Sequence, residues 1–231
     1  MTRRTISVKA AVVALGLVGW LGLTTHVQAA PVVVNGLTFS EVGAGVTITG
    51  GAGTGSLADP IVLSETITSL DATISIGGML AFDQNLIGSL HTVGFALTKV
   101  ITNATGADWT FFDNELQEIL GTPSPDGDGL SFGQGCAACR PFVGDLLPVV
   151  NEEIVLRDFV NFSGGSVPNG GVLTLSFVIT DNSPLDLVYL RQRPNFRPTE
   201  GVPEPASLLL LGSGLAGLGL WGWKRRRDVQ A

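Results

Sequence analysis

Histidine is scarce in this chain of 231 residues, which contains only two. His26 lies in an apolar N-terminal segment, so His91 is the one histidine of the central region. A serine nucleophile needs an activating base, and no Gly-x-Ser-x-Gly motif marks a serine placed beside one. We therefore interpret His91 as an ordinary residue at the edge of a strand.

Carboxylates are abundant, so hydrolysis of glycosides by a pair of acidic residues stays open at this point. The available side chains are Glu115, Glu118, Glu152 and Glu153. Acidic residues at this density usually belong to a solvated surface. We expect a protein that is not an enzyme and that binds no cofactor.

Cysteine is equally rare, and the two cysteines form a single motif, Cys136-Ala137-Ala138-Cys139. Haem attachment would require a histidine where Arg140 stands. A zinc site needs four ligands, and the chain offers no second cysteine pair. A redox dithiol prefers a helix N-terminus, whereas strands and a Gly-rich loop are expected here. In an oxidising compartment Cys136 and Cys139 should form a structural disulfide.

Cations are few in the region between residues 31 and 201, which has six Lys and Arg against eighteen Asp and Glu, a formal charge of −12. The whole-chain value of −7 hides this imbalance, because seven of the thirteen cations lie near the two ends. Such an acidic region repels nucleic acid and anionic lipid. We expect no nucleic-acid partner, and interpret the charge mainly as a source of solubility.

Helical periodicity is absent from the same region, and apolar residues instead alternate with polar or small ones at 93–98 and 173–180. This period of two predicts strands with one face on a core. Clusters of Gly, Asn, Asp and Pro between the apolar runs predict turns. One or two helical turns are expected only at 114–120. Further strands are expected at 32–39, 61–70, 72–76, 109–112, 153–162 and 185–190.

Roughly eight or nine short strands predict an all-β fold, an antiparallel two-sheet sandwich of which a jelly roll is one version. About 170 residues remain once the two ends are set aside, which is the length of one domain. The domain boundaries we expect are 31–200 for the sandwich, with a signal segment on either side.

Asp126-Gly127-Asp128-Gly129 is the one segment that resembles a calcium loop, because its two carboxylates are separated by glycines. It lacks the third acidic position and the distal glutamate of an EF-hand. Asp and Gly are also the commonest turn residues. We favour a turn and expect no metal site, with Asp126 and Asp128 kept as the weak calcium candidates.

Residues 1–30 have the three parts of a secretory signal peptide. Arg3, Arg4 and Lys9 are basic, 10–23 is apolar, and Val27-Gln28-Ala29 is a cleavage site of small residues. We expect signal peptidase to cut after Ala29 or Ala30, and the general secretory machinery to export the chain.

Residues 201–231 contain the sequence VPEPASLLLLGSGLAGLGLWGWKRRR. Nothing charged interrupts 206–223, and eighteen apolar residues are about enough for a transmembrane helix. The basic cluster after it should stay cytoplasmic, which places the preceding domain outside. The cations that stop transfer are Lys224, Arg225, Arg226 and Arg227.

The triplet Pro203-Glu204-Pro205, the apolar run and the basic cluster stand in an order that resembles the C-terminal sorting signal of PEP-CTERM proteins of Gram-negative bacteria. The resemblance implies that an exosortase, a membrane transpeptidase, processes the chain near this triplet. It also implies an anchored precursor in the inner membrane, followed by a mature form in the periplasm, at the cell surface or in the extracellular matrix. An ordinary single-span anchor with a Pro-rich stalk is the alternative.

A second resemblance covers about 93–190. Asn103-Ala104-Thr105-Gly106, then Trp109, then Asp128-Gly129-Leu130-Ser131-Phe132 stand in the order of an NxTGxxW…DGLSF pattern that is similar to a domain often found ahead of this sorting signal. It implies a β-sandwich and supplies no catalytic residue.

Two functions are compatible with these features. The first is an exported, surface-sorted, non-enzymatic protein of the extracellular matrix or an exopolysaccharide layer. The second is a secreted carbohydrate-binding or carbohydrate-active sandwich, in which Trp109 would be exposed and stack on a sugar. Burial of Trp109 and dispersal of the acidic residues would favour the first.

Overall fold

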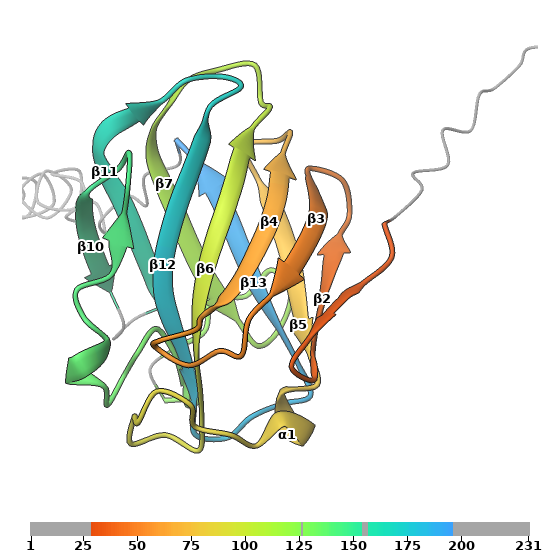
Figure 1. Cartoon of the computed structure of the whole chain (residues 1–231), viewed down its shortest axis with the longest axis vertical. Helices are drawn as coiled ribbons and strands as arrows, with labels where there is room; N and C mark the ends of the chain where they lie inside the picture. Colours follow the sequence, from red (N-terminus) through yellow and green to blue (C-terminus); the bar gives the residue numbers. More distant parts are fainter. Residues whose placement is uncertain (1–28, 126, 154–156, 196–231) are drawn as a thin grey trace, which may run out of the picture.

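The computed structural model describes residues 29–125, 127–153 and 157–195. Within these ranges the chain folds into two β-sheets that face each other, and only two single-turn helical segments accompany them (Figure 1). No helix in these ranges is long and apolar enough to span a membrane. The described part of the chain is therefore an all-β domain, as its alternating sequence predicts.

The first sheet has seven strands, and its central strand, β13, is the last one in the described chain. In spatial order the strands are β1 (Val32–Val34), β2 (Leu37–Val42), β5 (Ala72–Gly77), β13 (Leu187–Pro194), β7 (Trp109–Gln117), β11 (Phe159–Val167) and β10 (Val149–Glu153).

The second sheet is centred on two long strands that pair over ten residues, β6 and β12. In spatial order its strands are β3 (Val46–Ala52), β4 (Ile61–Ile67), β6 (Val93–Asn103), β12 (Val172–Asp181) and β8 (Leu130–Ser131), and β9 (Val143–Gly144) also pairs with β12. The helical segments are α1 (Met79–Phe82) and a 3-10 turn (Ala137–Cys139).

One strand pair departs from the antiparallel sandwich that the sequence predicts. β4 and β6 are parallel, with Ile61 opposite Leu97 and Ile67 opposite Asn103. The strand between them in sequence, β5, belongs to the other sheet. The connection from β4 to β6 therefore runs through the other sheet, by way of β5 and the short helix α1, and this long crossover permits a parallel pair.

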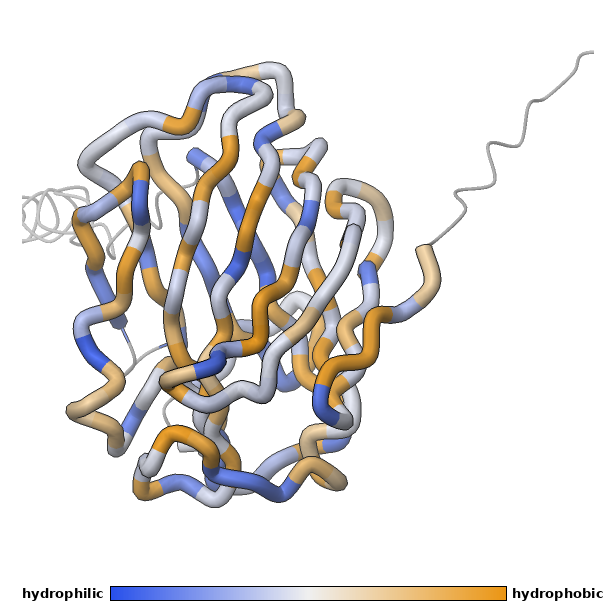
Figure 2. Tube along the Cα trace, in the orientation of Figure 1, coloured by the Kyte–Doolittle hydropathy of each residue, from blue (hydrophilic) through white to orange (hydrophobic). Residues whose placement is uncertain are grey.

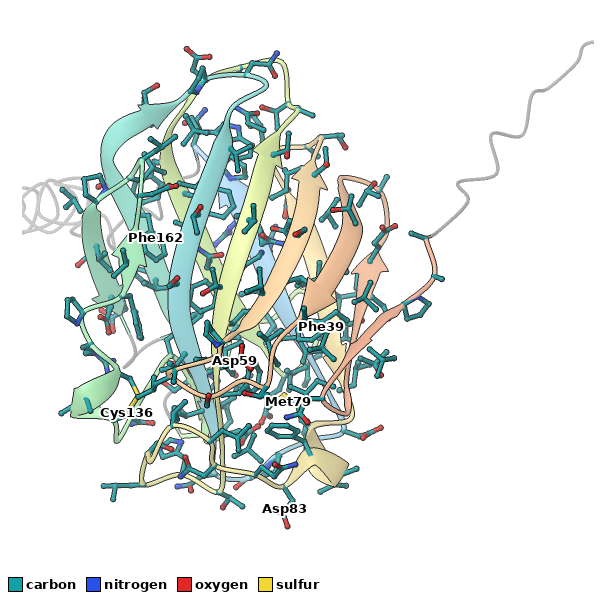
Figure 3. All side chains as sticks on the ribbon, in the orientation of Figure 1. Phe39, Asp59, Met79, Asp83, Cys136 and Phe162 are labelled. Atoms are coloured by element: carbon teal, nitrogen blue, oxygen red, sulfur yellow. A yellow bond between two sulfur atoms is a disulfide. The ribbon has the colours of Figure 1, made fainter. Side chains whose placement is uncertain are left out.

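The core lies between the sheets and consists of the inward side chains of alternate residues. On β6 these include Val93, Phe95, Leu97 and Ile101, each buried. Figure 2 shows the resulting alternation of apolar and polar residues along the strands. Figure 3 shows Phe39 of β2 and Phe162 of β11 toward the right and left ends of the seven-stranded sheet, with Met79 of α1 below Phe39. The alternation of apolar residues thus correctly predicts which face of β6 and of β12 is turned to the core.

Segment 32–39 is a hairpin and not the single strand that we predicted. β1 and β2 are joined by Asn35 and Gly36, whose φ angles of 47° and 86° are both positive. Two such residues form the tight turn whose twist matches that of a β-hairpin. Asn-Gly is the strongest sequence signal for this turn, so the hairpin could have been predicted from the sequence.

Two further predictions were wrong. The segment expected as a helical turn, 114–120, begins inside β7, which runs to Gln117. The segment expected as one strand, 153–162, instead contains the end of β10 and the beginning of β11. In both segments polar residues stand on a buried face, which hides the alternation.

Candidate functional site

The two signal segments lie outside the described residues. The cleavage segment ends where the description begins, at residue 29, and Pro203, Glu204, Pro205 and the basic cluster Lys224 to Arg227 follow its last residue, Asn195. β13 is the last described strand before them. Any pull transmitted from the C-terminal segment to the domain therefore reaches β13 first.

Cys136 and Cys139 are joined by a disulfide, and the described residues contain no free cysteine. Both residues are more than 90 % buried. The bond closes a short loop beside Arg140, whose guanidinium donates to the carbonyl oxygens of Gly133 and Phe132 and to the carboxylate of Glu152. Figure 3 shows Cys136 at the lower left of the sandwich, far from α1. The arrangement closes a loop, as a structural disulfide does.

Asp128 shapes a turn. Its carboxylate accepts hydrogen bonds from the Ser124 hydroxyl and, at 3.1 Å, from the backbone N–H of Leu130. In the described residues no three His, Cys, Asp or Glu side chains gather in a way that could hold a metal ion. The other calcium candidate, Asp126, lies outside those residues.

Asp181 is a buried carboxylate close enough to Asp128 for the two charges to repel each other. Burial, more than Asp128, raises the pKa of Asp181 to about 6, and its hydrogen bond from Ser183 opposes this rise. Burial also raises the pKa of Glu118, assisted by the charges of Asp128 and Asp181. Asp128, Asp181 and Glu118 are thus close enough for their charges to interact, and this place in the fold disfavours the ionised forms of Asp181 and Glu118.

His91 lines an open cavity of about 530 Å³ together with Asp128 and Ser183. In a Ser-His-Asp triad the Nδ1 atom of histidine is held by the carboxylate. The Nδ1 atom of His91 is buried and has no hydrogen-bond partner. Burial lowers the pKa of His91, partly offset by a hydrogen bond with the backbone of Gly129. The geometry is not that of an activated nucleophile.

The glutamates considered for glycoside hydrolysis occupy different places. Glu115 lies on β7 among arginines, and Glu152 on β10 accepts from Arg140 Nη2 at 2.7 Å. Glu118 follows β7 and Glu153 ends β10. Glu115 and Glu152 are each held by an arginine, the arrangement of a structural ion pair.

Trp109 is 0 % exposed, so its ring is unavailable for stacking on a sugar. Its Nε1–H donates to the Thr105 hydroxyl at 2.9 Å, and that hydroxyl donates to Asn103 Oδ1. Asn103 Nδ2 in turn donates to the carbonyl oxygens of Ala107 and Val167. The Asn-x-Thr-Gly-x-x-Trp segment therefore fastens the β6–β7 turn to the end of β11, which is a structural role.

A row of charges on the outer face of the seven-stranded sheet escaped the sequence analysis. Asp113 and Glu115 of β7 lie directly opposite Arg193 and Arg191 of β13. Arg193 Nη2 is 2.8 Å from Glu115, and Arg193 Nε is 2.8 Å from Asp113. Arg157 adds a third cation, with Nη1 3.3 Å from Glu115. We call Asp113, Glu115, Arg157, Arg191 and Arg193 the outer ladder.

Burial has the largest effect on the pKa of one member of the outer ladder, Asp113. It raises the pKa of Asp113 to about 6, although the charges of Arg193 and Arg157 act in the opposite direction. Arg191 also binds Asp71, with Nε 2.8 Å from Oδ1, and this hydrogen bond lowers the pKa of Asp71. The ladder could have been found only from the register of β7 and β13, because its members on these two strands are about 80 residues apart in sequence.

A second polar cluster lies in the interior, between the two sheets. Lys99 Nζ is 2.7 Å from Glu65 Oε1, and both side chains are 0 % exposed. Gln192, also 0 % exposed, reaches them from β13 in the opposite sheet. We call Glu65, Lys99 and Gln192 the interior triad.

These ion pairs include every Lys and Arg that the structure describes. Those five cations, of which Arg140 lies outside both clusters, are each within 4.0 Å of a carboxylate. The cations of the described domain are therefore neutralised locally. Its excess of carboxylates is left to determine the long-range field.

Comparison with family models matches the PEP-CTERM protein-sorting motif to residues 201–227. The chain carries a PEP-CTERM sorting motif. Comparisons with curated proteins and with solved structures gave no match. Proteins with this motif are exported through the membrane as precursors for processing by an exosortase, which agrees with the order of segments in this sequence.

Proposed function

We propose that this chain is a non-enzymatic protein of the cell surface, sorted by an exosortase into an extracellular matrix or exopolysaccharide layer. The observation that carries the proposal is the PEP-CTERM motif at 201–227, immediately after a folded β-domain that ends near Asn195. In this arrangement the motif directs the sorting and the sandwich is the delivered part.

The side chains of the domain support a structural function. The cysteines form a disulfide, Trp109 is buried in a hydrogen-bonded corner, and Asp128 shapes a turn. The described cations are ion-paired, and the acidic excess keeps the domain hydrated and apart from anionic polymers. Such a domain suits a hydrated layer outside the cell.

Processing of a Glu204→Gln variant tests the sorting step. A recognised carboxylate makes charge-assisted hydrogen bonds that a neutral amide cannot replace in full, whereas a spacer needs only length and stiffness. In a host with the cognate exosortase, we expect the longer precursor to accumulate on a gel when Glu204 is replaced.

Glu118→Gln is the matched control, because it makes the same chemical change in the domain. Glu118 stands in a group of mutually repelling carboxylates, so removal of its charge should leave the fold intact. Processing of Glu204→Gln at the wild-type rate would support the stalk and membrane anchor in place of exosortase sorting.

A further inference from the structure

The interior triad joins the centres of the two sheets. Lys99 is on β6 and Glu65 on its neighbour β4, whereas Gln192 is on β13 of the opposite sheet. The inward neighbours of Lys99 along β6 are Leu97 and Ile101, both 0 % exposed. An amine, a carboxylate and a carboxamide are thus enclosed together in an apolar core.

The contacts within the triad form a closed ring. Glu65 Oε1 is 2.7 Å from Lys99 Nζ, and Glu65 Oε2 accepts a hydrogen bond of 3.3 Å from Gln192 Nε2. Lys99 Nζ in turn contacts Gln192 Oε1 directly. The amine therefore lies against the carboxamide group, while one carboxylate touches the nitrogen atoms of both partners.

The surroundings favour a nucleophilic amine. Desolvation lowers the pKa of Lys99, against the opposing charge and hydrogen bond of Glu65. A lysine whose ammonium form is disfavoured by burial has a larger fraction of neutral amine, which is the nucleophilic form. Fixed contact with the carbonyl group supplies the proximity that a slow bimolecular reaction lacks.

We propose that Lys99 and Gln192 form an intramolecular isopeptide bond, with Glu65 as the catalytic residue. The bond would link β6 to β13 covalently, across the core and across 93 residues of sequence. Its formation requires only the three side chains that the fold brings together.

The reaction balances without an added reagent. Lys99 Nζ adds to Gln192 Cδ and gives a proton to Glu65 Oε1, which is the oxygen atom beside it. The Cδ–Nε2 bond then breaks, and the carboxylic acid of Glu65 returns a proton to the departing nitrogen. The products are a secondary amide and one molecule of ammonia, and no atom is oxidised or reduced.

Glu65 is positioned for both proton transfers because its two oxygen atoms face the two nitrogen atoms. General acid–base catalysis requires such a group within hydrogen-bond reach of the proton that moves. Glu41 offers a comparison, since it is also an inward carboxylate, but its Oε1 accepts from the backbone N–H of Ile48. Glu41 therefore provides a matched control.

A covalent link at this place has a mechanical consequence, which rests on the proposed sorting function. β13 is the last described strand before the sorting motif, so it is the first to bear a pull from that end. The isopeptide bond would transfer that pull to β6 at the centre of the other sheet. Unlike a disulfide, it would survive a reducing environment.

Peptide mass spectrometry of the full chain tests the chemistry independently of sorting. Cleavage after glutamate places Lys99 in peptide 66–115 and Gln192 in peptide 154–200. We expect one branched peptide with the summed mass of the two less one ammonia, and fragment ions that locate the branch at Lys99 and Gln192. Recovery of the two separate peptides from folded wild-type protein would overturn the proposal.

Variants assign the catalytic role. Glu65→Gln also removes the cleavage site after residue 65, so Lys99 then lies in peptide 42–115. This variant should yield separate peptides, and Glu41→Gln should yield the branched one. A branched peptide in folded Glu65→Gln protein would show that Glu65 is not the catalyst. If Glu65→Gln does not fold, the wild-type digest still decides whether the bond forms, and Lys99→Arg, which keeps a cation but removes the amine nucleophile, provides the unlinked reference.

Discussion

The outer ladder and the interior triad lie on opposite faces of the same strand. Along β13, Arg191 and Arg193 face outward and Gln192 faces the core, because side chains alternate along a strand. The ladder joins neighbouring strands of one sheet, and Arg191 is 29 % exposed. The triad joins two sheets and is wholly buried.

The two clusters differ in whether a second cation can take the place of one that is lost. A ladder cation that is lost can be replaced in part by another, because Arg157 contacts the same carboxylates as Arg193. Lys99 has no such neighbour, since it is the one lysine of the described chain and the other described cations pair elsewhere. We therefore expect perturbation of the triad to cost more than perturbation of the ladder.

Lys99→Met should have the largest effect of any change considered. It retains most of the side-chain volume but leaves Glu65 buried without a cation, and loss of one partner of a buried pair costs about 3–5 kcal/mol. Denaturant unfolding of the purified protein should show this loss. A loss below about 1 kcal/mol, the range of exposed pairs, would contradict our distinction between the two clusters.

The triple variant Lys99→Met/Glu65→Leu/Gln192→Leu sharpens the comparison, because it removes all three polar side chains of the interior triad and leaves none of them without a partner. An apolar replacement of a buried ion pair is often neutral or stabilising. If the triad is held only by non-covalent contacts, the triple variant should regain wild-type stability. If it is covalently linked, stability should stay below that of the wild type, because the unfolded wild-type chain would remain constrained by a loop of 93 residues.

Arg193→Met in the outer ladder should have an intermediate effect. It removes hydrogen bonds to two buried carboxylates, and hydrogen bonds to charged groups contribute about 1.5–3 kcal/mol. Arg157 remains beside both carboxylates, so we expect a loss of about 2 kcal/mol in urea unfolding at neutral pH. Arg191→Met is the control, since its main partner, Asp71, is 52 % exposed and should tolerate the loss.

The sequence predicted those parts of the molecule whose signals are local. Strands β6 and β12 follow from alternation, since apolar side chains on one face suffice to mark them. The sorting motif likewise is a linear order of residues, which needs no fold to be recognised. The signal for the Asn35-Gly36 turn was also local, and we were wrong to predict a single strand there.

The parts that escaped depend on contacts distant in sequence. β7 was expected to end at Phe112 because Asp113 and Glu115 break the apolar pattern, and only pairing with β13 explains their burial. Lys99 was not singled out from the sequence, although its position in the inward row of β6 places it in the core. Neither cluster can be assembled without the register of β13.

Asp113→Asn should alter the pH dependence of stability. The native pKa of Asp113 is about 6 against an ordinary value of 3.8, so the native state binds this proton more tightly than the unfolded state does. The contribution of this bound proton to the free energy of unfolding is thus complete below about pH 4 and is lost as pH rises through 6. Asparagine cannot ionise, so the variant should gain about 2–3 kcal/mol relative to wild type between pH 4 and 7.

Urea unfolding at several pH values would measure this difference, and comparison with wild type cancels the other titrating groups. Asp186→Asn is the control, because Asp186 is an exposed carboxylate outside the outer ladder. A constant difference between Asp113→Asn and wild type across this window would mean that the ladder holds Asp113 ionised at a normal pKa. Of these two clusters, only the interior triad would then have a pKa shifted mainly by burial, that of Lys99.

The smallest effect should follow from Cys136→Ser/Cys139→Ser, which removes a covalent link outside both clusters. A disulfide stabilises chiefly through the loop it closes in the unfolded chain, and this loop spans a sequence separation of three. We expect a loss of about 1 kcal/mol, measured by urea unfolding under identical conditions. Reduction of wild-type protein should give a similar shift and is the natural control for the two serines. A loss as large as that of Lys99→Met would show that Arg140 and Glu152, which this loop positions, contribute to the core, and the fold would then depend on a third polar cluster.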